Sequence, residues 1–328
     1  MATHMIPPAY APDFLAAHGW RDATILPLAG DASFRRYFRV IHGDRRAVLM
    51  DAPPPHEDPR PFLSVADYLS GHGFRAPAVH GRDLDRGLVL LEDFGDRLMR
   101  AHLDQHPQDE AAIYRQAIDE LVRLADCPPA SVPRYGEEAY LREVRLFTEW
   151  YCPAAGLSVD SDSYDAVWLK MLQPLLDCTR PVTVLRDYHA ENIMLLDDGR
   201  LGLLDFQDAL VGHAAYDLVS LLQDARRDVA PALEQDMLTY YRAATGSGAD
   251  FDFLYHLLGA QRNAKIIGIF TRLWQRDGKP RYLDFLPRMW GLLERDLSYP
   301  GMEPVARWFA DNVPHDVRRS KLGMGENR

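Results

Sequence analysis

The sequence VLRDYHAENIML at residues 184–195 is followed closely by LGLLDFQDAL at residues 201–210. Here Asp187, Asn192 and Asp205 stand at the ends of short apolar runs, where carboxylates and amides are costly to bury. The runs predict a short strand that ends at Asp187, then a loop, then a hairpin between Asn192 and Asp205. Such a layout can bring three oxygen-bearing side chains to one point at the mouth of a cleft.

These three side chains suit magnesium-dependent phosphoryl transfer. Mg²⁺ prefers oxygen ligands, keeps several waters and binds phosphates through one or two protein groups. Asp187 would accept or orient the proton of an attacking hydroxyl, while Asn192 and Asp205 hold Mg²⁺ on the nucleotide's phosphates. Each residue by itself is more often a turn residue that caps local backbone. The combined pattern, D-x-x-x-x-N, a hairpin and D-F, matches the catalytic and metal-binding loops of protein kinases.

Length and charge limit the class of protein. A chain of 328 residues that is 47% apolar can bury a large core, in one big domain or two lobes. The formal net charge of -11 argues against duplex nucleic acid and against anionic membrane as the main partner. The expected partners therefore include neither nucleic acid nor a membrane.

The sequence indicates neither a signal for export nor a cysteine-bound metal site. The first residues, MATHMIPPAY, lack the basic and apolar regions of a signal peptide, and no run approaches the roughly 18 to 20 apolar residues that span a bilayer. The cysteines, Cys127, Cys152 and Cys178, are odd in number and form no C-x-x-C pair. We therefore expect a cytoplasmic protein.

Residues 1–92 are expected to form a small, strand-rich lobe. After a short helix near residues 12–18, the strings ATILPLAG, SFRRYFRVIHG and RRAVLMD predict three antiparallel strands with turns at Gly30-Asp31 and Gly43-Asp44. RPFLSVADYLSGHG predicts a helix with a glycine end, and GLVLLEDFG predicts a further strand. Residues 93–97 would form a hinge.

Residues 98–328 are expected to form a larger, helical lobe. Helix-period segments dominate it: DEAAIYRQAIDELVRLA, EEAYLREVRLFTEWY, SYDAVWLKMLQPLL and FLYHLLGAQRNAKIIGIFTRL. The single β interruption holds PVTVLRD, NIMLL, the turn DDGR and LGLLDF, so the predicted catalytic and metal-binding loops lie within this lobe. The predicted fold class is α+β with two lobes.

The order of these segments resembles the kinase-like phosphotransferase family that includes aminoglycoside phosphotransferases and choline kinases. The resemblance runs from LAGDASFRRYFRV through LVLLEDFGD and LRDYHAENIM to LLDFQDA and AAYDLVSLLQDAR. It implies a protein-kinase-like fold that uses ATP and Mg²⁺. It also implies that Asp187 is the catalytic base, that Asn192 and Asp205 are magnesium ligands, and that Asp217 is a structural acid behind the catalytic loop.

Shorter strings resemble a narrower group, the bacterial N-acetylmuramate/N-acetylglucosamine anomeric kinases of peptidoglycan recycling. These strings are GDASFRRYFRV, VLMDAPP, LEDFGD, RDYHAEN, DFQDA and QRNAKIIGIFTRL. The implied reaction is ATP-dependent phosphorylation of an amino sugar at its anomeric hydroxyl. The alternatives are a kinase of another alcohol, such as an aminoglycoside or choline, and a non-catalytic pseudokinase-like binding protein. The exact sugar and anomer, ATP against GTP, and the oligomeric state stay open.

One departure from the kinase pattern concerns the phosphate-binding cation. Met50 stands on the third strand where relatives place a lysine, and the first hairpin lacks a G-x-G-x-x-G run. Phosphate contact would then depend on backbone amides and the hydroxyl of Ser33. Arg35 and Arg36 could supply the missing charge, although a solvated strand face explains either arginine equally well.

The adenine is expected between the lobes, bonded to backbone groups of the connector from Glu92 to Phe94. Tyr37, Val48 and Leu203 could enclose the ring, and ordinary core packing is the alternative for each of them.

The acceptor sugar would contact polar residues of the helical lobe. The candidates are Gln207 and Asp208 beside the metal loop, Arg226, and Arg262 with Asn263. A carboxylate-bearing muramic acid favours an arginine partner, although arginines on helices usually lie on the surface. His189 would contact substrate or phosphate, or order the catalytic loop through hydrogen bonds.

Overall fold

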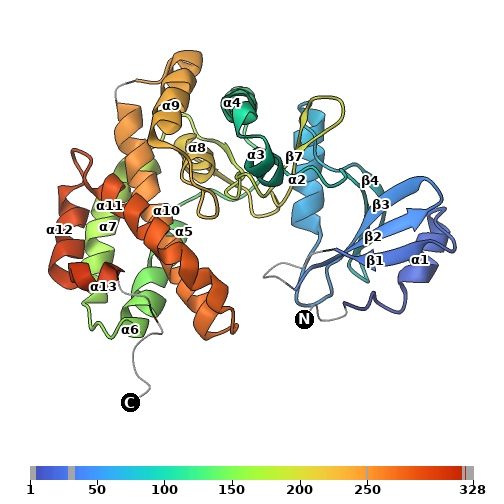
Figure 1. The fold of residues 1–328 in the computed structure, drawn as a ribbon, viewed down its shortest axis with the longest axis horizontal. Helices are drawn as coiled ribbons and strands as arrows, with labels where there is room; N and C mark the ends of the chain where they lie inside the picture. Colours follow the sequence, from blue (N-terminus) through green and yellow to red (C-terminus); the bar gives the residue numbers. More distant parts are fainter. Residues whose placement is uncertain (1–4, 29–33, 249, 320–321, 323–328) are drawn as a thin grey trace. The chain divides into compact units, whose positions relative to one another are not determined.

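The computed structural model describes residues 5–28, 34–248, 250–319 and 322. The chain forms two compact units, whose helices and strands are labelled in Figure 1. The first unit comprises Met1–Gln108 with Glu191–Ala209, and the second comprises Asp109–Ala190 with Leu210–Arg328. The lobe boundary expected at residues 93–97 stays a prediction.

The first unit is built on a five-stranded antiparallel sheet with strand order β1-β2-β3-β5-β4. Its strands are β1 Thr24–Pro27, β2 Arg36–His42, β3 Arg45–Asp51, β4 Val79–Asp83 and β5 Leu88–Glu92. The three strands expected between residues 23 and 51 are confirmed, as is the turn at Gly43, which has a φ of +60°. The other expected turn, Gly30-Asp31, lies outside the described residues. The edge strand β4 was not predicted, because its sequence VHGRD has no apolar alternation.

Alternation along the strands gives the sheet two different faces. One face packs on helix α1 (Ala11–Ala17) and buries Phe14, Trp20, Phe38, Val40, Leu49 and Leu90. Because successive side chains point to opposite sides, Tyr37, Val48 and Met50 belong to the other face. Tyr37 and Val48, two of the three residues expected at the adenine ring, therefore lie on the face opposite the α1 core.

The remaining elements of the first unit are helices α2 (Arg60–Gly71) and α3 (Met99–Gln105) and the hairpin β7–β8 (Ile193–Leu195 and Leu201–Leu203). Backbone hydrogen bonds join the hairpin to the unit: Leu195 donates to the Arg97 carbonyl and Leu203 to the Arg75 carbonyl, both at 2.8 Å. Asn192 and Asp205 flank this hairpin, so the first unit carries both side chains.

The second unit is mainly helical. Its helices are α4 Glu110–Asp126, α5 Glu137–Val144, α6 Cys152–Ala154, α7 Ser161–Leu176, α8 Ala215–Leu222, α9 Pro231–Thr245, α10 Asp250–Gln275, α11 Leu286–Leu297, α12 Glu303–Asn312 and α13 His315–Arg319. Strand β6 (Val182–Val184) pairs with β9 (Leu210–Gly212), a strand that was not predicted. None of the described helices combines the length and apolar character that a bilayer-spanning segment requires.

The segment EEAYLREVRLFTEWY was expected to form one helix, but α5 ends at Val144 and a π-helix follows at Phe147–Tyr151. Helix α10 passes very close to this junction. A Cβ placed on Gly268 would lie 2.3 Å from the carbonyl oxygen of Leu146. The wider π turn also carries Phe147 and Tyr151, which pack on Trp290. Tertiary packing therefore overrides the local helical period here.

We expect Gly268→Ala to lower the free energy of unfolding by about 1 to 3 kcal/mol, because the added methyl group would overlap backbone atoms of Leu146 and Phe147. Gly291 on α11 is the matched control, since a Cβ there meets no atom within 4 Å. Gly291→Ala should raise the free energy of unfolding by up to about 1 kcal/mol through helix propensity. Denaturant unfolding measures both, and equal effects would contradict the proposed close contact.

Candidate active site

The backbone leading to Asp187 is held by two side chains of α8. The Asp217 carboxylate accepts the N–H groups of Leu185 at 2.7 Å and Arg186 at 2.8 Å. The Ser220 hydroxyl donates to the Arg186 carbonyl at 3.0 Å. Both side chains are buried, so these bonds have no competition from water. The peptide groups before Asp187 are therefore fixed at three points.

Arg186 directly precedes Asp187 and has an unusual backbone conformation, with a φ of +71°. Its guanidinium forms an ion pair with the buried carboxylate of Glu143 on α5. Lys265 of α10 reaches the same carboxylate at 3.0 Å, and the Tyr135 hydroxyl also donates to it. Glu143 thus links two cations beside the loop and helps to hold Arg186 in its strained conformation.

Electrostatics favour the ionised form of Asp187. Burial by itself raises the pKa of this carboxyl, but interactions with His189, Lys265 and Arg262 outweigh burial and leave the pKa below its ordinary value. Behind it, burial raises the pKa of Asp217 to about 7, while its two backbone hydrogen bonds favour the charged form. Asp187 is therefore ionised near neutral pH, as a group that accepts or orients a proton must be.

A second carboxylate holds the other side of the loop. Asp224 accepts the N–H of Ala190 at 3.3 Å and the N–H of Arg226 at 2.8 Å. The guanidinium of Arg226 lies 3.4 Å from Nε2 of His189, whose pKa burial lowers, so that His189 is neutral at pH 7. Asp224 thus connects the loop to the segment that carries Arg226.

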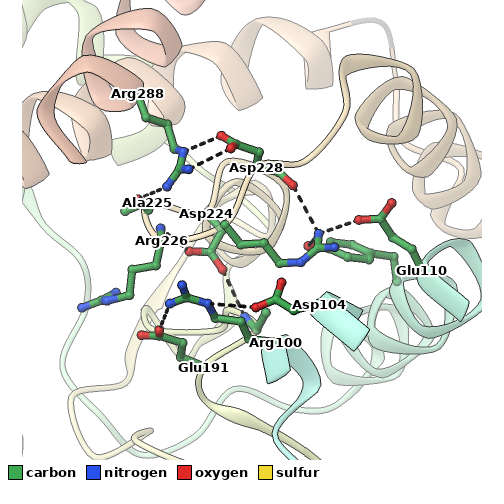
Figure 2. A network of polar contacts seen from close by, with 12 residues as sticks. Arg100, Asp104, Glu110, Glu191, Asp224, Ala225, Arg226, Asp228 and Arg288 are labelled. Carbon is green, nitrogen blue, oxygen red and sulfur yellow. Dashed lines mark hydrogen bonds and ion pairs between the residues drawn. The ribbon is translucent and has the colours of Figure 1, made fainter. Parts of the chain in front are cut away.

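The segment after α8 is stabilised by further ion pairs. Figure 2 shows Arg288 contacting Asp228 through both carboxylate oxygens. Arg227 forms an ion pair with Glu110 at 2.5 Å. These pairs keep the segment around Arg226 attached to helices α11 and α4. Arg226 is therefore presented by an ordered part of the second unit.

The predicted metal ligands lie side by side in the first unit. Asn192 Nδ2 is 3.4 Å from Asp205 Oδ2, and a half-turn of the amide would present its oxygen instead. Gln207 donates to the other oxygen of Asp205 at 3.0 Å, and Asp205 itself has a φ of +57°. Within the described ranges no group of three His, Cys, Asp or Glu side chains could hold a metal. A carboxylate and an amide nevertheless fit Mg²⁺ that is bound chiefly through phosphates and water.

The predicted nucleotide-binding residues that can be placed all belong to the first unit. Arg36 contacts Asp51, whereas Arg35 lies near Glu57 and Asp205. Ser33 lies outside the described residues. Tyr37 and Val48 are half-buried on one face of the sheet.

The connector residues of this predicted site are also placed by local contacts. Glu92 forms an ion pair with Arg75 at 2.6 Å and accepts the Ala78 N–H. The Phe94 ring lies against Gly202, next to the buried Leu203.

The predicted acceptor-binding residues fall into both units. Gln207 lies in the first unit and donates to Asp205 and to the exposed Asp208. Arg262 of α10 is buried and donates to the Ser220 hydroxyl at 2.9 Å. Arg262 therefore supports the backbone before Asp187 through Ser220.

Asn263 has a different environment from Arg262. It is fully buried and donates to Gln223 at 2.7 Å and Asp296 at 3.0 Å. These hydrogen bonds connect α10 to the end of α8 and to α11. They give Asn263 a structural role in the interior of the second unit.

Several residues that shape the site carried no signal in the sequence. Glu143 and Lys265 are ordinary polar positions of helical segments, and Asp224 follows such a segment. The contacts of Glu143 with Arg186, of Lys265 with Glu143 and of Asp224 with Ala190 span 43, 122 and 34 positions of the chain. Only the fold brings them to the loop. Glu57, which lies near Arg35, also carried no signal, since it follows a proline-rich stretch and belongs to no motif.

The profile of the phosphotransferase enzyme family matches residues 24–253, which include strands β1 to β9 and the Asp187 loop. The chain belongs to this family. Two relatives are named N-acetylmuramate/N-acetylglucosamine kinase. The one from Pseudomonas aeruginosa is 39% identical, with 86% of this chain and 87% of the relative covered. The one from Caulobacter vibrioides is 36% identical, with 93% of this chain and 96% of the relative covered.

Solved structures agree on the fold of this phosphotransferase. Choline kinase LicA from Streptococcus pneumoniae has a TM-score of 0.61 at 12% identity, with 87% of this chain and 93% of that chain covered. Aminoglycoside phosphotransferase APH(2'')-Ib, solved with ADP, has a TM-score of 0.58 at 14% identity, with 87% and 97% covered. The predicted α+β, two-lobed, protein-kinase-like fold is confirmed.

We expect Glu143→Gln to destabilise the protein by about 3 kcal/mol at pH 7, because Arg186 and Lys265 would lose their shared carboxylate. Burial raises the pKa of Glu143, but Lys265 and Arg186 outweigh it and bring the pKa to about 2, below its ordinary value of 4.5. A lowered pKa contributes stability above pH 4.5 that is lost as the pH falls towards 2.

The stability difference between wild type and Glu143→Gln should therefore shrink between pH 4.5 and pH 2. Urea unfolding at a series of pH values measures it. A difference that stays constant across this range would contradict the ion-pair network.

Proposed function

We propose that this protein is an ATP-dependent kinase that phosphorylates N-acetylmuramate and N-acetylglucosamine at the anomeric hydroxyl, in peptidoglycan recycling. The observation that carries the proposal is the similarity to relatives that have this pair of sugars in their name, including those from Pseudomonas aeruginosa and Caulobacter vibrioides, at 36–39% identity over most of both chains. The Asp187 loop supplies the chemistry, since its carboxylate is ionised and its backbone is fixed.

Asp187 is the group that accepts or orients the proton of the sugar hydroxyl. An anomeric hydroxyl is more acidic than an ordinary alcohol because the ring oxygen withdraws charge. A single carboxylate can therefore handle its proton in a loose, metaphosphate-like transition state. Asp217 and Ser220 position this carboxylate through the backbone of Arg186.

Asn192 and Asp205 are the residues that would hold Mg²⁺ on the phosphates of ATP. The metal would neutralise charge on the phosphoryl group during transfer. Asp205 is oriented by Gln207, and Asn192 is positioned because its carbonyl accepts the N–H of Leu204 at 3.0 Å.

Arg226 is the residue that would recognise the carboxylate of N-acetylmuramate. Its backbone is anchored by Asp224 and its guanidinium lies beside His189, two residues after Asp187. A planar guanidinium matches a carboxylate through two parallel hydrogen bonds. Arg262 is less suited to this contact because it is buried and bonded to Ser220.

We expect Asp187→Asn to lower turnover by at least about two orders of magnitude, since positioned base catalysis contributes roughly that much. Nucleotide binding should stay near that of the wild type. Asp205→Ala is the contrasting variant, and it should weaken binding of the magnesium nucleotide as well as turnover. Steady-state kinetics and calorimetric titration with ADP measure both, and near-normal turnover of Asp187→Asn would remove Asp187 from the mechanism.

The position of the new phosphate tests the proposed acceptor. We expect the product of either sugar to be a 1-phosphate, whose phosphorus NMR signal couples to the single proton on C1. A 6-phosphate would couple to two methylene protons instead. A 6-phosphate product, or transfer to choline or an aminoglycoside but to neither sugar, would overturn the amino-sugar proposal and leave the kinase assignment intact.

A further inference from the structure

The third strand has an uncharged residue, Met50, at the position where kinase relatives place a lysine for the phosphates of ATP. Met50 of β3 is fully buried, and its neighbours across the ladder are Tyr37 and Val89. If the protein binds ATP, as the proposed function requires, a cation must reach the phosphates from another position. The two adjacent arginines before and at the start of β2, Arg35 and Arg36, have very different surroundings.

Arg36 is committed to a structural contact. Its Nε and Nη2 donate to Asp51 at 2.8 Å and 2.5 Å, and its Nη1 donates to the Ile6 carbonyl at 3.2 Å. Asp51 is fully buried, so moving Arg36 away would leave a buried carboxylate without its cation. This cost keeps Arg36 on Asp51.

Arg35 lies between two carboxylates, one of which is the predicted metal ligand Asp205. Its Nε is 3.9 Å from Glu57 Oε2, and its Nη2 is 3.7 Å from Asp205 Oδ1. At these distances both carboxylates attract the guanidinium by charge and hold it beside the predicted metal position. Glu57 also accepts the N–H of Phe34 at 3.1 Å, which fixes the backbone just before Arg35.

We propose that Arg35 is the cation that binds the terminal phosphates of ATP, in place of a lysine on β3. Asp205 is then shared: without nucleotide it faces Arg35, and with Mg²⁺ and ATP it faces the metal. Arg35 transfers its donors to phosphate oxygens, which a guanidinium matches through two parallel bonds. Glu57 keeps the guanidinium near Asp205 during this exchange.

A purely structural role for Arg35 makes different predictions. If Arg35 only ties the start of β2 to Asp205, its loss would lower stability and would affect every ligand of the first unit alike. If it binds phosphates, the loss of affinity grows with the number of phosphates. The metal and Arg35 would also compete for Asp205, so the loss of Arg35 would strengthen metal binding to the nucleotide-free protein.

The experiment compares Arg35→Met, Arg35→Lys and the control Arg46→Met. Arg46 is exposed on β3 near the opposite end of the β2–β3 ladder, where it pairs with Ile41, so its replacement removes the same charge. Affinities for adenosine, ADP and ATP with Mg²⁺ are measured on the full chain by competition with a fluorescent nucleotide. Mn²⁺ binding without nucleotide is followed by electron paramagnetic resonance.

We expect Arg35→Met to weaken ATP binding by about ten- to hundredfold and adenosine binding by less than about twofold. Arg35→Lys should lie between this variant and the wild type, and Arg46→Met should match the wild type. Mn²⁺ should bind Arg35→Met up to about fivefold more tightly.

Equal losses for adenosine and ATP, or unchanged ATP affinity in both Arg35 variants, would overturn the inference. A wild-type protein that binds no ATP would overturn the proposed function instead. If Arg35→Met does not fold, the test is the ratio of ATP affinity to adenosine affinity in Arg35→Lys. A ratio equal to that of the wild type would overturn the inference.

Discussion

The loop that carries Asp187 depends on one carboxylate that accepts two backbone N–H groups. Asp217 bonds Leu185 and Arg186, and this places the peptide before Asp187 in a conformation that a non-glycine residue rarely adopts. Such a backbone persists only where its surroundings over-determine it. Ser220 supplies a third bond to the same peptide, and Arg262 supports Ser220. The strain at Arg186 is therefore balanced by contacts from two helices, α8 and α10, that are themselves buried.

Charge is distributed so that Asp187 stays ionised although its surroundings are largely buried. Glu143 takes up the charges of Arg186 and Lys265, while Arg262 contributes positive charge without an ion pair to a carboxylate among the described residues. The result is a loop where burial and charge act in opposite directions on the pKa of Asp187, and charge prevails. The proposed role of Asp187 as the base needs this state, because a protonated aspartate cannot receive the proton of the attacking hydroxyl.

The first unit solves a different electrostatic problem. The sheet has the buried Met50 on β3, and two arginines stand where the chain enters β2. Of two neighbouring arginines, one neutralises the buried Asp51 and the other faces Glu57 and Asp205. Arg35 precedes β2 and Arg36 is its first residue, and the two side chains have different partners. Asp205, the proposed metal ligand, thus has the Arg35 guanidinium nearby.

The sequence by itself determined the kinase-like fold, three strands of the first sheet, the hairpin flanked by Asn192 and Asp205, and the candidate base Asp187. These follow from local periodicity and from the spacing of polar residues along a short segment. The tertiary structure alone decided that a π-helix follows α5 and that β4 and β9 form. It also decided that Arg35 and Arg36 contact different carboxylates. It also decided that Glu143, Asp224 and Lys265 serve the loop. The partners that matter lie far away along the chain. Burial, which sets how strongly two charges interact, exists only after folding.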